Sequence, residues 1–170
     1  GALIFSISLL ILYLSSTLYH SFFMLPHWMY IFQVADHCGI YILIAGSYSP
    51  FCMIALHHEM AGQVLIILLW VAAMCGCLFS MSSDLNAAST EKVEVFFFLA
   101  MGLSVGFVWG KIVSALSAEA LNLLVFGGAA YIIGIVFFKI GNTIPIYHTV
   151  WHVFVMIGSG SHWYCVYNHI

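Results

Sequence analysis

Five polar residues with metal-binding or acid–base chemistry stand inside otherwise apolar stretches of this 170-residue chain. They are Ser16, His20, Asp36, His148 and His152. On a helix, a residue and its fourth successor lie on one face, about 6 Å apart along the axis. The spacing therefore predicts that His148 and His152 chelate one metal ion, and that Ser16 lies beneath His20.

Imidazole ligands point to zinc, because Ca²⁺ and Mg²⁺ prefer oxygen ligands. Three protein ligands plus a water form the open coordination of a catalytic zinc ion, which makes that water a nucleophile near neutral pH. Asp36 is interpreted as the only Asp or Glu well inside an apolar segment, where an unpaired charge is costly. We expect Asp36 to orient the water or take its proton. Ser16 is expected to hydrogen-bond to a ligand, the Asp36 carboxylate or the water.

The competing interpretation is structural, since a His-x-x-x-His pair on a helix more often serves packing or a hydrogen bond between helices. The matching depth of the whole set favours the metal. His37 points about a third of a turn away from Asp36, so it is left outside the ligand shell. His162 is expected to hydrogen-bond within the bundle. The other histidines are expected at the membrane interfaces: His27, His57, His58 and His169.

Composition defines the elements that must position these residues. The chain is 64% hydrophobic and 5% charged, whereas soluble domains are about 25% charged. Lipid must therefore be the solvent for most of its surface. The continuous apolar character of the segments favours helices over the alternating strands of a barrel. We predict an all-α polytopic transmembrane bundle, one domain over 1–170, with six helices at 1–22, 29–56, 61–83, 92–115, 119–138 and 144–169.

Alternating helix directions bring the chemical residues to one membrane depth. The first helix ends, and the second and sixth begin, on the same side, so the three ligand histidines and Asp36 share that side. Lys92 and Lys139 fall there too, while Lys111 falls on the opposite side. The positive-inside rule then predicts that the metal site faces the cytoplasm.

Several remaining features restrict the function. A net charge of −3 gives no basic surface for nucleic acid, so a nucleic-acid partner is not expected. Pro50 lies inside the second segment and predicts a kink. The five cysteines have neither zinc-finger nor redox spacing and are interpreted as small packing residues: Cys38, Cys52, Cys75, Cys77 and Cys165.

At these residues the sequence resembles the hemolysin III branch of the progestin and adipoQ receptor family. The matching pieces extend from the first helix to the last. They are Ser16-x-x-x-His20, the run 35–41 (Ala-Asp-His-Cys-Gly-Ile-Tyr), the run 44–51 (Ile-Ala-Gly-Ser-Tyr-Ser-Pro-Phe), and 148–154 (His-Thr-Val-Trp-His-Val-Phe) followed by Gly158-Ser159. The family has seven helices, an internal amino terminus and zinc toward the cytoplasm. Because this chain opens at Gly1 within an apolar run, we expect a fragment that lacks the family's first helix.

The resemblance also implies roles for individual residues. His20, His148 and His152 are then the zinc ligands, and Asp36 with Ser16 holds the zinc-bound water. The related alkaline ceramidases carry a similar arrangement and hydrolyse the amide of ceramide. The adiponectin receptors are described as signalling receptors and as candidate ceramidases.

Three functions are therefore weighed. The first is zinc-dependent hydrolysis of an amide or ester in a lipid-like substrate that enters from the bilayer. The second is a membrane receptor or homeostasis protein with a structural zinc and a lipid-like ligand. The third is a haem-binding electron carrier. Two haems need four axial histidines in facing pairs, and the position of His148 and His152 on one helix argues against it.

Overall fold

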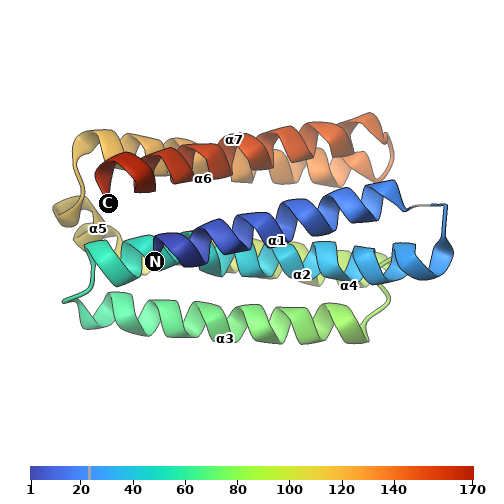
Figure 1. Cartoon of the computed structure of the whole chain (residues 1–170), viewed down its shortest axis with the longest axis horizontal. Helices are drawn as coiled ribbons and strands as arrows, with labels where there is room; N and C mark the ends of the chain where they lie inside the picture. Colours follow the sequence, from blue (N-terminus) through green and yellow to red (C-terminus); the bar gives the residue numbers. More distant parts are fainter. Residues whose placement is uncertain (23) are drawn as a thin grey trace. The chain divides into compact units, whose positions relative to one another are not determined.

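The structure is a computed structural model that describes residues 1–22 and 24–170 (Figure 1). Every regular element in this described part is a helix, as the sequence predicts. The chain forms two compact units, Gly1–Val108 and Trp109–Ile170. A single transmembrane domain over 1–170 stays a prediction.

The first unit is organised around its second helix. Its elements are α1 (Ala2–Ser21), α2 (Pro26–Pro50), the π-helical turn η1 (Phe51–Ala55), α3 (Met60–Ser82), α4 (Ala88–Leu103) and the 3₁₀ turn η2 (Ser104–Val108). Helix α2 packs against α1, α3 and α4, and consecutive helices run in opposite directions (Figure 1). A residue on α2 can therefore reach three neighbouring helices.

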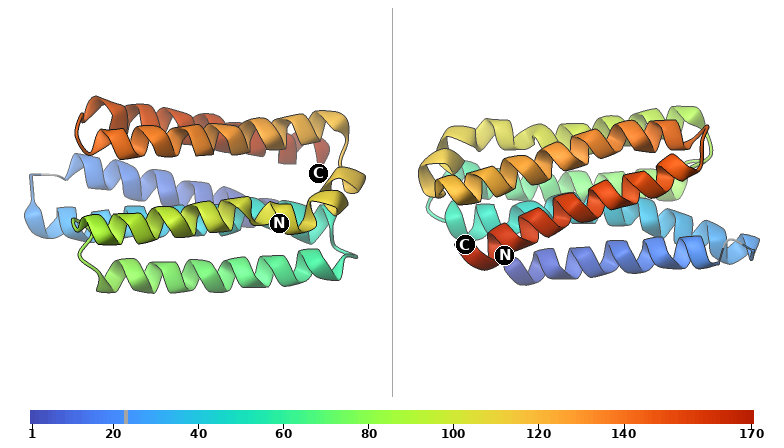
Figure 2. Two further views of the ribbon diagram at one scale, coloured as in Figure 1. Left: turned by 180° about the vertical axis from the view of Figure 1, so that it is seen from behind. Right: turned by 90° about the horizontal axis from the view of Figure 1, so that it is seen from above.

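The second unit is a helical hairpin with a short leading helix. It consists of α5 (Trp109–Ala115), α6 (Ala118–Gly141) and α7 (Ile146–His169), with α6 and α7 packed antiparallel (Figure 2). A Cβ atom added to Gly127 would overlap the His162 ring, so the glycine lets the two helices approach closely. The His162 ring also donates through Nε2 to the Leu124 carbonyl at 3.1 Å. This confirms the predicted hydrogen bond within the bundle.

Five helical segments of the described residues are long and apolar enough to cross a membrane: Ala2–Ser21, Trp28–Ala55, Met60–Ser82, Ala88–Ala115 and Ala118–Gly141. They correspond to the first five predicted segments. Helix α7 is as long as α6, with 24 residues each. Its histidines, serines and asparagine keep it outside the group of strongly apolar helices. The sixth predicted helix is thus present and is more polar than the others.

Helix α4 begins four residues earlier than the predicted start at 92. The residues 88–91, which lie between the predicted segments, form its first turn, and that turn carries Glu91. A negative charge in the first turn is favourable because the amino-terminal end of a helix dipole is positive. The connection shortens accordingly, to 83–87.

Pro50 marks a change of helix type. Helix α2 ends at Pro50 and the chain continues as the π-helical turn Phe51–Ala55, where the Leu56 N–H donates to the Phe51 carbonyl at 2.9 Å. Proline removes one donor from the regular ladder, and a wider turn accommodates that loss. The predicted kink thus coincides with a π-helical segment, a recognised cause of helix bending.

Helices α1 and α2 meet along a seam of small residues spaced seven apart. A Cβ atom on Gly46 would overlap the Ser8 hydroxyl, and one on Gly39 would lie 3.1 Å from Ser15 Oγ. Both serine hydroxyls donate to carbonyls of their own helix, at 2.7 Å and 3.0 Å. A seven-residue repeat keeps one face of each helix in register, and small residues there permit close packing.

The described cysteines are all free thiols. Cys52 and Cys165 are buried, in agreement with a packing role, and Cys75 is exposed. Cys38 on α2 and Cys77 on α3 contact one another, each thiol lying 3.8 Å from the other residue's carbonyl oxygen.

Four histidines are predicted at the membrane interfaces. The structure describes the side chains of three of them, and the prediction for His27 lies outside the described side chains. His57 and His58 are exposed in the turn after η1, with ring centroids 3.6 Å apart. His169 is the last residue of α7. Their position at a membrane interface stays a prediction.

Candidate metal and acid–base site

In the first unit, the predicted site residues lie at the end of α1 and in the first half of α2. Ser16 and His20 lie in the last two turns of α1, and Asp36 lies on α2. Asp36 is only 7% exposed. The Ser16 hydroxyl is a hydrogen-bond partner of its carboxylate, and His20 lies within electrostatic reach of the same group. This contact matches one of the three partners considered for Ser16, and the roles of Ser16 and Asp36 at a metal-bound water stay a prediction.

The first turns of α7, in the second unit, carry two further candidate ligands, His148 and His152. The rings of His148 and His152 meet edge to face, with centroids 4.7 Å apart and planes inclined at 83°. The ring of Phe138 on α6 packs beside the His148 ring, with 6.1 Å between the two ring centroids. A Cβ atom on Gly141 would lie 2.9 Å from the His148 backbone nitrogen, so only glycine lets the end of α6 come this near. The pair is therefore supported from behind by the end of α6.

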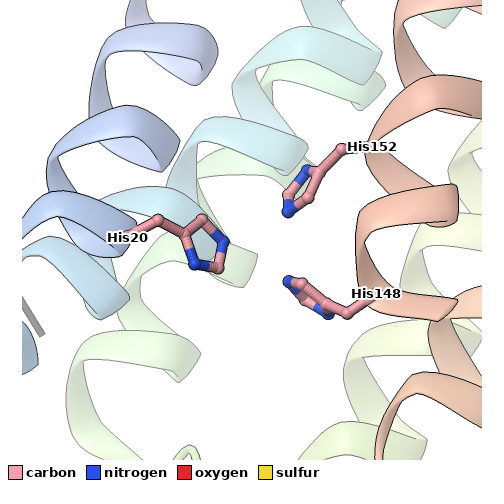
Figure 3. A group of neighbouring side chains, drawn as sticks. All are labelled: His20, His148 and His152. Carbon is pink, nitrogen blue, oxygen red and sulfur yellow. The ribbon is translucent and has the colours of Figure 1, made fainter. Parts of the chain in front are cut away.

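His20, His148 and His152 form a candidate metal-binding group, each offering one imidazole nitrogen (Figure 3). All three are at least partly accessible, and no second group of this kind occurs in the described part of the chain. Neutral imidazole nitrogen is a common ligand of zinc and also suits other transition metals. The donor chemistry fits a zinc ion, and the spacing of the α7 pair fits two ligands from one helical face.

A second buried carboxylate, Glu94 on α4, was not recognised from the sequence. It is 2% exposed, although it stands at the start of a predicted segment and follows a polar stretch. Glu94 Oε2 lies 2.7 Å from His37 Nδ1, and the Ser80 hydroxyl donates to Oε1 at 2.6 Å. Asp36 is therefore one of two buried carboxylates among the described residues, and the sequence interpretation had recognised only that one. Internal partners on α2 and α3 allow Glu94 to be buried.

An apolar layer lies one helical turn beyond this polar cluster. Tyr41 is fully buried and its ring lies 4.6 Å from that of Phe98. A Cβ atom on Gly76 would overlap the Tyr41 ring. Tyr41, Phe98 and Gly76 lie four residues from His37, Glu94 and Ser80 respectively. Each of the three helices thus contributes to a polar layer and, one turn away, to an aromatic layer.

The signal that could have revealed Glu94 is this shared spacing of four residues. Glu94 and Phe98, and likewise His37 and Tyr41, each place a polar and an aromatic residue on one helical face. A single sequence does not say which faces meet, because pairing of α2 with α4 depends on helix packing.

The long apolar helices indicate an integral multi-pass membrane protein. The three histidines and the buried Asp36 carboxylate give it a candidate metal site. The sequence profile of the Haemolysin-III related family matches residues 1–163. The chain belongs to this family, which confirms the resemblance to the hemolysin III branch of the progestin and adipoQ receptors.

Bacterial and animal proteins are similar along nearly the whole chain. The hemolysin-3 homolog of Bacillus subtilis (strain 168) is 35% identical over 96% of this chain and 74% of its own length. Hemolysin-3 of Bacillus cereus is 32% identical over 96% of this chain and 72% of its own length. The human monocyte to macrophage differentiation factor is 29% identical over 99% of this chain and 70% of its own length.

Proposed function

We propose that this protein is a zinc-dependent hydrolase that cleaves an amide or ester bond in a lipid-like substrate. The observation that carries the proposal is the Asp36 carboxylate, which is 7% exposed and has Ser16 and His20 of α1 as neighbours. A buried carboxylate inside a membrane helix is costly and marks functional sites. A bound cation beside His20 is the natural reason to keep it.

His20, His148 and His152 are the proposed zinc ligands. Their donor chemistry and the i, i+4 arrangement of the α7 pair support this assignment. A zinc ion in such a site supplies Lewis acidity and a nucleophile near neutral pH. We propose that the site faces the cytoplasm, which the positive-inside rule favours on the count of Lys92 and Lys139 against Lys111.

Asp36 is the proposed general base. Its carboxylate accepts a proton from the attacking nucleophile, and the Ser16 hydroxyl orients it for that task. The substrate enters from the surrounding lipid, because large apolar side chains cover much of the exposed surface of the described helices. The substrate class is therefore one whose scissile bond carries a long apolar chain.

A non-enzymatic receptor or homeostasis protein with a structural zinc is the second candidate. The similarity to the human protein named monocyte to macrophage differentiation factor favours it, since that name denotes an effect on cell fate. The same three histidines would then bind zinc to join helices, with no turnover. The two candidates differ in what Asp36 must do.

Asp36→Asn separates them. Asparagine keeps the volume and can still accept from Ser16, but it is not a base. We expect zinc to be retained while the release of fatty acid from ceramides and other lipid amides and esters falls about 10²–10⁴-fold. Zinc content and product release are measured on the same purified protein in detergent.

Asp84→Asn is the matched control, because Asp84 lies exposed in the turn before α4 and accepts from the Asn86 backbone nitrogen at 3.0 Å. It should leave both readouts unchanged. Wild-type protein that releases no product from a broad lipid panel would favour the receptor. Loss of zinc from Asp36→Asn would identify Asp36 as a direct ligand and contradict its role as base.

A further inference from the structure

Glu94 is held inside the first unit by partners on two other helices. Its Oε2 atom pairs with His37 Nδ1 of α2 at 2.7 Å, and its Oε1 atom accepts from the Ser80 hydroxyl of α3 at 2.6 Å. Glu94 is 2% exposed and the His37 side chain 16%. Both carboxylate oxygens are thus engaged, and α2, α3 and α4 are joined at one level.

His37 is the residue next to Asp36 along the chain. Consecutive residues diverge by about 100° around a helix axis. Asp36 has Ser16 and His20 of α1 as neighbours, whereas His37 pairs with Glu94 of α4. Helix α2 is therefore held on two sides by two adjacent polar residues.

The closest contact between α1 and α2 lies away from the level of Asp36. The seam of small residues runs from Ser8 and Gly46 to Ser15 and Gly39, about one turn short of Asp36. A carboxylate about 5 Å from the helix axis moves by about 2 Å when the helix turns by about 20°. A misplacement of about 1 Å can lower a rate about 10²-fold.

We propose that Glu94 is a positioning residue for Asp36. By holding His37 from α4, it fixes the rotation of α2 so that the Asp36 carboxylate faces Ser16 and His20. Its effect on catalysis rests on the proposed hydrolase function, whereas its effect on the rotation of α2 does not.

Kinetics of Glu94 variants test the effect on catalysis. Glu94→Ala removes both hydrogen bonds and should lower kcat about 10²-fold with KM nearly unchanged and zinc retained. Glu94→Gln keeps the shape and can bond both His37 and Ser80, so it should restore kcat to within about tenfold of wild type. A role in charge rather than in position would make the two variants equally slow.

Tyr48→Phe is the matched control, because it also removes a polar link between α2 and the α4 segment. The Tyr48 hydroxyl donates to the Gly102 carbonyl at 2.5 Å and accepts from the Val105 nitrogen at 3.0 Å, three turns from Asp36. It should leave kcat unchanged. Ser80→Ala removes one partner of Glu94 and should lower kcat in the same direction as Glu94→Ala, so it decides the question if Glu94→Ala does not fold.

The native thiols of Cys38 and Cys77 report the rotation of α2 without any activity. Cys38 follows His37, and Cys77 lies three residues before Ser80 on the same face of α3. Dibromobimane, which joins two thiols a few ångströms apart, should bridge them in wild type, Tyr48→Phe and Glu94→Gln. In Glu94→Ala and Ser80→Ala the yield of the bridged peptide, measured by mass spectrometry, should fall severalfold.

The outcomes separate the two proposals. Wild-type protein without hydrolase activity overturns the proposed function, and the bridging yields still decide the role of Glu94. Wild-type bridging in both Glu94→Ala and Ser80→Ala overturns the positioning role, whatever the kinetics. Wild type that forms no bridged peptide contradicts the helix arrangement on which the inference rests.

Discussion

Asp36 and Glu94 are both buried carboxylates on membrane helices, yet their surroundings differ. Glu94 has a close partner for each oxygen, on α2 and on α3. Asp36 has the Ser16 hydroxyl and a position near His20, a candidate metal ligand. Glu94 is satisfied by the protein's own side chains, whereas Asp36 lies beside a bound cation in the proposed function.

The difference separates two reasons for burying a charge. A carboxylate with matched internal partners fixes helices relative to one another, and removing it leaves those partners exposed to an apolar interior. A carboxylate beside metal ligands acts on what the metal binds, so its removal should alter chemistry more than stability. Variants of Glu94 should therefore lose stability, whereas variants of Asp36 should lose mainly activity.

The largest effect is expected at the metal ligands. His148→Ala leaves two of the three proposed imidazoles and should remove most of the zinc, measured by metal analysis after dialysis, because two imidazoles make a poor site. Glu94→Ala should keep its zinc. Full zinc in His148→Ala would contradict the ligand assignment.

Chelation is expected to destabilise the protein next most strongly. Zinc that binds only the folded state at about a thousand times its Kd contributes about 4 kcal/mol. The thermal midpoint in detergent should therefore fall when zinc is removed and recover when it is restored. His148→Ala is the control, since chelator should leave its midpoint unchanged. Equal midpoints for zinc-loaded and zinc-free wild type would show that the metal does not join helices.

Glu94→Ala should lower the free energy of unfolding by about 3 kcal/mol, because it breaks a buried pair and leaves His37 and Ser80 without their partner. Asp36→Asn should change it by less than about 1 kcal/mol, since the shape is kept and a buried charge is removed. Denaturant titration of both variants measures the contrast. A larger loss of stability in Asp36→Asn than in Glu94→Ala would show that Asp36, and not Glu94, is the carboxylate that holds the helices together.

Gly76→Ala tests the packing beside Glu94 and should have a smaller effect on stability than Glu94→Ala. The added methyl overlaps the Tyr41 ring, so it should cost about 1–3 kcal/mol. Gly102→Ala is the control, because nothing lies within 4 Å of a Cβ atom at that position. Zinc content should be unaffected in both. Equal midpoints for the two variants would show that the aromatic layer tolerates added volume.

Sequence reasoning found the helices because a membrane helix is specified locally, by about 20 apolar residues in succession. It placed Asp36 and Ser16 at one membrane depth because helix direction alternates, and the contact between them is compatible with that depth. It also separated His37 from Asp36 correctly, from the angle between consecutive residues. These successes share a short-range or topological cause.

Glu94 was missed because its burial is not a local property. A glutamate at the start of a membrane helix, after Ser89-Thr90-Glu91-Lys92, has the same local sequence whether it faces headgroups or a histidine 57 residues earlier in the chain. The π-helical turn after Pro50 was missed for a related reason. Proline predicts a disturbance of the helix, and tertiary packing decides which form that disturbance takes.

The distance along the chain between His37 and Glu94 has a consequence for biogenesis. The ribosome must add 57 residues after His37 before its partner exists. At about 5–20 residues per second this takes roughly 3 to 11 seconds. During that interval α2 carries Gln33, Asp36 and His37 toward the bilayer, where a central Asp alone opposes insertion by about 3 kcal/mol. Until α4 leaves the ribosome, the apolar residues of α2 must therefore offset this cost without the help of Glu94.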